Sequence, residues 1–148
     1  EAFLYVINDL ISRDYRHYLR ENQKVAYIAD TKFTLSNSSL SFIAESSKLT
    51  AKELEMLTQE FILNFFHIKL SSLSDTEFEA ALHRVLANLE RTGKVEKQLD
   101  SLNTQYQRGF KNFDYNAKIS NQLKRLTKEK LIRLYKPYIA KLNKSVTE

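Results

Sequence analysis

The stretch that decides the fold runs from Val25 to Glu45 and reads VAYIADTKFTLSNSSLSFIAE. At its beginning and at its end, the large apolar residues recur at every second position, as they do in half-buried strands. Between them, Ser36-Asn37-Ser38 is typical of a turn. The apolar positions that share a strand face are Val25, Tyr27 and Phe33 in the first part and Leu40, Phe42 and Ala44 in the second. The pattern predicts two antiparallel strands joined by a hairpin.

Helical patterns surround this stretch. Before it, the segment 3–19 has apolar residues at helical spacing. After it, Thr50 with Glu53 and Ser74 with Glu77 have the spacing of capping boxes, which begin helices. The apolar residues expected on the buried faces of these two helices are Leu54, Leu57, Phe61, Phe65 and Ile68, then Phe78, Ala81, Leu82, Val85, Leu86 and Leu89.

The remainder of the chain also predicts helices. Gly93 should end the helix before it. Another helix runs from about Val95 to Phe110, with Leu99, Leu102 and Tyr106 aligned on one side and Gly109 near its end. Two shorter helices follow, and we expect Asp114 and Thr127 to cap them. Pro137 should kink or end the last one.

Residues 1–148 are enough for one domain, and only two glycines and one proline interrupt them. We therefore expect a single α+β domain, a helix-rich layered unit with a small antiparallel sheet. Two strands make a poor sheet alone, and the chain does not begin with methionine. The interpretation is a truncated domain from a larger protein, whose exposed strand edges would favour a homo-oligomer.

The residues provide no self-sufficient catalytic or metal centre. Cysteine is absent, and His17, His67 and His83 are not paired at the spacing of a helical zinc site. Neither a nucleophile elbow nor a P-loop occurs. No apolar run approaches the ~20 residues that cross a bilayer. We expect no metal site and no membrane span in this chain, and the compartment stays open between cytoplasm and periplasm.

Charged residues are distributed unevenly along the chain. From Thr104 onward there are eleven Lys and Arg residues but three acidic residues, within a formal net charge of +5. Such a segment can bind nucleic acid or an acidic partner, but a solvated helix face is the commoner explanation. No RNA-binding signature accompanies the basic segment, and a basic nucleic-acid-binding module is therefore kept only as an alternative.

Several short motifs resemble one family in order and spacing. Leu19-Arg20 followed by Val25-Ala26-Tyr27-Ile28 resembles a signature in the C-terminal half of insulysin/pitrilysin-type zinc metallopeptidases, the inverzincins. The later motifs similar to this family are Leu40 to Ser46, Leu73 to Phe78, Asn112-Phe113-Asp114 and Leu126 to Leu131. The resemblance covers essentially the whole chain.

This resemblance implies a metallopeptidase LuxS/MPP-like fold and a non-catalytic, substrate-binding domain. In such enzymes an N-terminal catalytic half carries zinc, and the two halves enclose an oligopeptide. The partners implied are that N-terminal half and a peptide substrate, and the cofactor implied is zinc in the other half, with none in this chain.

By the same resemblance, Arg20 and Tyr27 are the substrate-binding residues, and their side chains would donate hydrogen bonds to peptide carbonyls. The chain departs from the family pattern at Glu21, Lys24 and Ala26, which replace Thr, Gln and Gly. Because Ala does not readily adopt the positive φ open to Gly, the strand could enter differently. A catalytically dead structural or adaptor domain of the same fold is therefore the second alternative.

Overall fold

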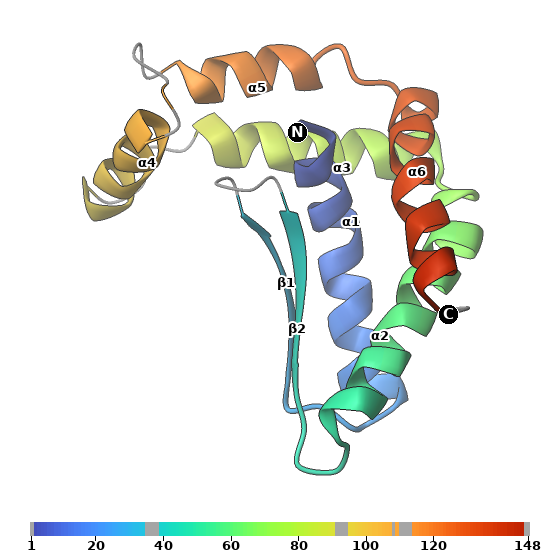
Figure 1. Cartoon of the computed structure of the whole chain (residues 1–148). Coiled ribbons are helices and arrows are strands. Elements are labelled where there is room, and N and C mark those ends of the chain that lie inside the picture. The colour runs from blue at the N-terminus through green and yellow to red at the C-terminus, as the bar shows by residue number, and fades with distance from the viewer. Residues whose placement is uncertain (1, 35–38, 91–94, 108, 110–113, 147–148) are drawn as a thin grey trace.

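The computed structural model describes residues 2–34, 39–90, 95–107, 109 and 114–146. The predicted turn at 36–38 and the predicted helix end at Gly93 lie outside these residues. Within them, one antiparallel hairpin lies beside a long helix, and further helices lie above both and on the side of the long helix away from the hairpin (Figure 1). The predicted helix-rich α+β fold with a small antiparallel sheet is confirmed.

The helix α1 (Ala2–His17) continues into a π-helical turn, η1 (Tyr18–Asn22), and a short loop leads to strand β1 (Ile28–Thr34). Strand β2 (Ser39–Glu45) returns antiparallel to β1, with Ile28 opposite Glu45 and Thr34 opposite Ser39. The two connections at the lower end of the hairpin, from η1 and to α2, therefore lie side by side in Figure 1.

Five further helices complete the described chain. They are α2 (Ala51–Asn64) with its π-helical extension η2 (Phe65–Leu70), α3 (Asp75–Glu90), α4 (Val95–Gln107), α5 (Tyr115–Leu123) and α6 (Lys128–Val146). The helices α3 and α5 cross above the hairpin and α1, while α2 and α6 form a second arm beside them (Figure 1). None of the helices described is both long and apolar enough to cross a bilayer.

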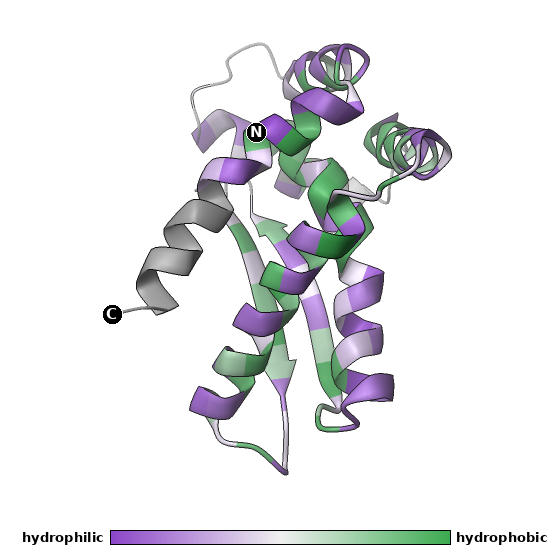
Figure 2. Ribbon diagram, turned by 90° about the vertical axis from the view of Figure 1, so that its right-hand side faces the viewer, coloured by the Kyte–Doolittle hydropathy of each residue, from purple (hydrophilic) through white to green (hydrophobic). Residues whose placement is uncertain are grey.

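One face of the hairpin packs on α1. Thr31 donates a hydrogen bond from its hydroxyl to Asn8 Oδ1 at 2.9 Å, and the ring centroids of Phe33 and Tyr5 are 4.5 Å apart. The predicted alternation is confirmed on β1, where Ala29 and Thr31 are buried while Ile28 and Asp30 are exposed. On β2, Phe42 and Ala44 are partly buried, and the residues between and beside them are exposed. Figure 2 shows that hydrophobic and hydrophilic residues are interspersed along both the strands and the helices.

Tyr15 lies at the centre of the core. Its ring is 1% exposed, and its centroid lies 5.2 Å from those of both Phe42 on β2 and Phe61 on α2. Its hydroxyl forms a hydrogen bond of 2.9 Å with Thr58. Burial raises the pKa of Tyr15, so the phenol is neutral at ordinary pH. One side chain thus joins α1, the sheet and α2.

The caps predicted for α2 and α3 are confirmed. Glu53 N donates to Thr50 Oγ1 and Thr50 N donates to Glu53, and Ser74 forms the same reciprocal pair with Glu77. The predicted cap at Asp114 is wrong in detail: its side chain makes no cap bond but pairs with Lys118 at 3.1 Å. Lys130 N donates to Thr127 Oγ1, as expected for a cap.

Two other expectations are corrected, at Ile68 and at Pro137. Ile68 was expected on the buried face of its helix but is 68% exposed, because it lies within the π-helical turn η2, where the regular helical period is interrupted. The aligned residues Leu99, Leu102 and Tyr106 on α4 are also exposed. The last helix does not end at Pro137 but continues to Val146.

Candidate functional site

The connection between η1 and β1 is folded back onto the end of the first helix. The carbonyl of Leu19 accepts hydrogen bonds from Val25 N at 3.1 Å and from Ala26 N at 3.3 Å. Arg20 and Tyr27 each lie one residue beyond these bonded positions. The backbone therefore brings the two predicted substrate-binding residues to the same exposed end of the hairpin, although six residues separate them in the chain.

Ser46 links this connection to the loop that follows β2 through hydrogen bonds of its hydroxyl. Its hydroxyl donates to Val25 O at 2.5 Å and accepts from Lys48 N at 2.9 Å and Leu49 N at 3.1 Å. Lys48 Nζ donates to Lys24 O at 2.8 Å. The sequence pattern did not assign Ser46 this role. Its place immediately after a strand, where serine hydroxyls bond nearby backbone, was the available signal.

Tyr27 is held by Glu45 on the neighbouring strand. Its backbone N donates to Glu45 O at 3.0 Å, and its hydroxyl donates to Glu45 Oε2 at 2.8 Å. This hydrogen bond to a carboxylate raises the pKa of Tyr27, because it favours the protonated phenol. Tyr27 was expected inside the strand, yet β1 begins at Ile28 and the Tyr27 side chain is 58% exposed.

Arg20 is exposed on η1. Within the part of the chain that the structure describes, its guanidinium has no hydrogen bond and no ion pair. An exposed guanidinium without an internal partner keeps all five N–H donors available to a ligand. The site thus combines one free cationic donor group with a phenol already oriented by a carboxylate.

Ala26, which stands where the family pattern has glycine, does not adopt a positive φ. Among the described residues, the only one other than glycine with a positive φ is Lys24, at 54°. The left-handed conformation therefore falls two residues before Ala26, and Tyr27 follows a residue of ordinary backbone geometry. The comparison with the family pattern suggested backbone strain at Ala26, whereas the positive φ occurs at Lys24.

Replacing Lys24 by glycine is expected to stabilise the protein modestly. Left-handed backbone costs a residue with a Cβ about 1–2 kcal/mol, part of which glycine loses again through its more flexible unfolded state. We expect Lys24→Gly to raise the free energy of unfolding by about 0.5 kcal/mol in urea denaturation. Ala26→Gly is the matched control and should be destabilising, because position 26 needs no positive φ.

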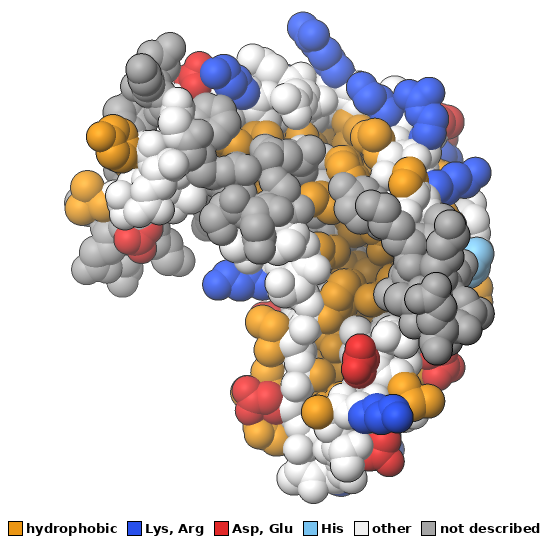
Figure 3. Space-filling view, viewed as in Figure 1, with side chains coloured by type: hydrophobic (Ala, Val, Ile, Leu, Met, Phe, Trp, Pro, Cys, Tyr) orange, Lys and Arg blue, Asp and Glu red, His pale blue; other side chains and the backbone are white. Residues whose placement is uncertain are grey.

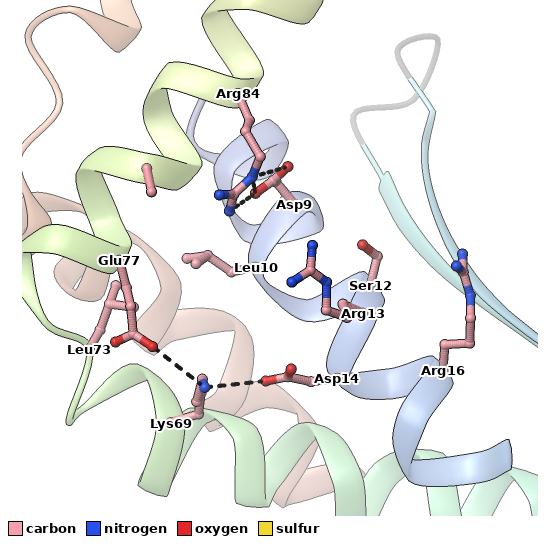
Figure 4. Close-up of a pocket in the computed structure, with 11 residues that line it drawn as sticks. Asp9, Leu10, Ser12, Arg13, Asp14, Arg16, Lys69, Leu73, Glu77 and Arg84 are labelled. Atoms are coloured by element: carbon pink, nitrogen blue, oxygen red, sulfur yellow. Dashed lines mark hydrogen bonds and ion pairs between the residues drawn. The ribbon is translucent and has the colours of Figure 1, made fainter. Parts of the chain in front are cut away.

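A separate cavity of about 430 Å³ lies between α1 and α3 (Figure 4). Arg84 Nη2 and Asp9 Oδ2 are 2.7 Å apart, while Lys69 Nζ lies 3.9 Å from Asp14 and 3.7 Å from Glu77. The hydrogen bond from Arg84 to Asp9 raises the pKa of the arginine. Ion pairs of this kind at the surface contribute at most about 1 kcal/mol each, so they add only modestly to the packing of α1, α3 and η2.

A second hollow exposes part of the core at β2. It has a volume of about 370 Å³ and lies between Tyr15, the inner face of β2 and α2. Figure 3 shows hydrophobic side chains lining the hollow between the strands and the second arm. For metal binding, the described residues contain no group of three or more His, Cys, Asp or Glu side chains that could hold an ion.

Comparison with solved structures defines the class of fold. The crystal structure of pitrilysin matches this chain with a TM-score of 0.75 at 19% sequence identity, over 89% of this chain and 14% of the pitrilysin chain. The chain thus has the fold of one part of a pitrilysin-type peptidase and spans a small share of that protein's length. A search of curated proteins gave no match.

Comparison with family models defines the family. The model described as PQQ synthase PqqF-like, C-terminal lobe domain 4, matches residues 6–108. The chain belongs to this family of C-terminal-lobe domains. The resemblance to the C-terminal half of inverzincin-type peptidases is therefore confirmed.

Proposed function

We propose that this chain is a non-catalytic, substrate-binding domain of a zinc-dependent oligopeptide-degrading metallopeptidase. It would face an N-terminal catalytic half across the bound peptide. The observation that carries the proposal is the folded-back connection at Leu19, which places Arg20 and Tyr27 at one exposed end of the hairpin. Membership in a C-terminal-lobe family supports it.

The two side chains suit a peptide backbone. A guanidinium donates hydrogen bonds, which peptide carbonyls accept. The one proton of the Tyr27 hydroxyl is donated to Glu45 Oε2, so the phenol oxygen can accept a hydrogen bond from a peptide N–H. Because the hydroxyl of Tyr27 is already fixed by Glu45, little conformational entropy is lost when a ligand binds near it. Arg20 contributes a permanent positive charge that strengthens its bond to a polarised carbonyl.

In this proposal the zinc ion is bound by the N-terminal catalytic half and not by the described residues of this chain. A zinc ion held by the catalytic half would polarise the scissile carbonyl as a Lewis acid. The described part of this chain offers no cluster of metal ligands, so its contribution would be to bind and orient the peptide.

Two substitutions in the full-length protein test the proposal. Arg20→Ala and Tyr27→Phe are each expected to lower kcat/KM for peptide cleavage by about 10- to 100-fold, the loss that follows removal of a charged donor or of a positioned hydroxyl from the bound peptide. Arg13→Ala and Tyr106→Phe are the matched controls, because both residues are exposed and lie on other elements, α1 and α4.

The second candidate, a structural or adaptor domain, predicts a different result. If Arg20→Ala and Tyr27→Phe both retain the kcat/KM of the controls, the two residues do not bind substrate. The domain would then have a structural or adaptor role that does not involve binding of the peptide by Arg20 and Tyr27.

A further inference from the structure

One of the two carboxylate oxygens of Glu45 is available for a ligand at the candidate site. Its Oε2 accepts the hydrogen bond from the Tyr27 hydroxyl at 2.8 Å, and Glu45 is exposed at the end of β2. Among the described residues, Oε1 accepts no hydrogen bond and forms no ion pair. A carboxylate has about four lone-pair positions, so Oε1 can still accept from a ligand cation while Oε2 holds the tyrosine.

An apolar strip lies next to this carboxylate on the outer face of the hairpin. Ile28 is directly opposite Glu45 in the register and is 41% exposed. Ile43 lies two residues before Glu45 on the same face and is 40% exposed. Side chains directly opposite each other are about 5 Å apart, and those two residues apart along a strand about 7 Å. A carboxylate beside two isoleucines matches a side chain with a hydrocarbon stem and a cationic end.

Among the described contacts, Lys48 and Arg16 each bond to a group other than Glu45. Lys48 Nζ is bound to the backbone carbonyl of Lys24. On the same outer face of β1, Asp30 pairs with Arg16 at 3.1 Å, which leaves Glu45 as the carboxylate whose own neighbour is a neutral phenol.

We infer that Glu45 makes this surface selective for peptides that carry a lysine or arginine side chain, which would lie along Ile28 and Ile43 and end at Glu45 Oε1. The inference rests on the proposed function and adds a substrate class to it. Arg20 would hold the peptide backbone, and Glu45 would select the side chain.

The test measures binding of synthetic peptides to the full-length protein by fluorescence anisotropy. One labelled peptide is neutral, and in its variants a single lysine occupies each position in turn. Each protein variant is characterised by the ratio of the neutral peptide's Kd to that of the best lysine peptide. For the wild type we expect a ratio of about two to five at low salt, as for one exposed charge pair, and a smaller ratio at high salt.

Glu45→Gln should bring this ratio to one, because the amide still accepts the hydrogen bond from Tyr27 but carries no charge. Glu79→Gln on α3 is the charge-matched control and should leave the ratio unchanged, since Glu79 is exposed on another element. A lysine preference that persists in Glu45→Gln, or no preference at any position in the wild type, overturns the inference but leaves the proposed function intact. If no peptide binds at all, the neutral one included, both proposals are overturned together.

Discussion

Tyr15→Ala is expected to lower the free energy of unfolding by about 3–5 kcal/mol, the usual cost of truncating a large aromatic side chain in a core. Tyr15 is 1% exposed and contacts both Phe42 and Phe61, so its removal opens a cavity where α1, the sheet and α2 meet. The hollow already present beside it, of about 370 Å³, would join this cavity and admit water. Urea denaturation followed by circular dichroism measures the change.

Tyr15→Phe separates packing from hydrogen bonding. It keeps the ring and removes only the hydroxyl that bonds Thr58, so we expect a loss of about 1 kcal/mol. A Tyr15→Ala variant no less stable than Tyr15→Phe would show that the ring is not the structural centre described above.

The alternation of apolar and polar residues was enough to predict the hairpin. Strand period is a local property, and Ala29, Thr31 and Phe42 lie on the side that the pattern assigned to the core. The capping boxes at Thr50 and Ser74 were predictable for a similar reason: the donor, the acceptor and the three-residue spacing are all local.

What the sequence did not predict depends on contacts between distant segments or on irregular helix geometry. The π-helical turns η1 and η2 insert extra residues into the helical period, so a pattern with regular spacing misplaces Ile68. On α4 the apolar residues Leu99, Leu102 and Tyr106 have helical spacing but remain exposed, because periodicity indicates a face without saying whether another element covers it.

The candidate site was predicted only in part. Arg20 and Tyr27 followed from the family resemblance, and the structure places both at one exposed end of the hairpin. Glu45 and Ser46 belong to the same resemblance, but their contacts to Tyr27 and Val25 cross some twenty residues of chain, and a single sequence does not reveal such pairs. The left-handed backbone fell at Lys24 rather than Ala26 because the loop closes on the carbonyl of Leu19.

Leu19→Ala is expected to cost about 2–5 kcal/mol of stability and to loosen the candidate site selectively. The Leu19 side chain is 0% exposed, and its backbone carbonyl holds Val25 N and Ala26 N. The substitution leaves the carbonyl in place but removes the packing that fixes its position. Amide hydrogen exchange at Val25 and Ala26 should therefore accelerate more than exchange in α3, because local opening needs less free energy than global unfolding.

Leu70→Ala is the matched control, since Leu70 is equally buried at 0% exposed but lies on η2, away from the connection between η1 and β1. It should cost a similar amount of stability while exchange at Val25 and Ala26 follows the global change. The comparison matters for function, because a peptide can use Arg20 and Tyr27 together only while the connection between them stays closed. If exchange at Val25 and Ala26 is the same in both variants, Leu19 contributes only to overall stability and the two side chains are positioned by other contacts, of which those of Ser46 with Val25 and of Glu45 with Tyr27 are the strongest candidates.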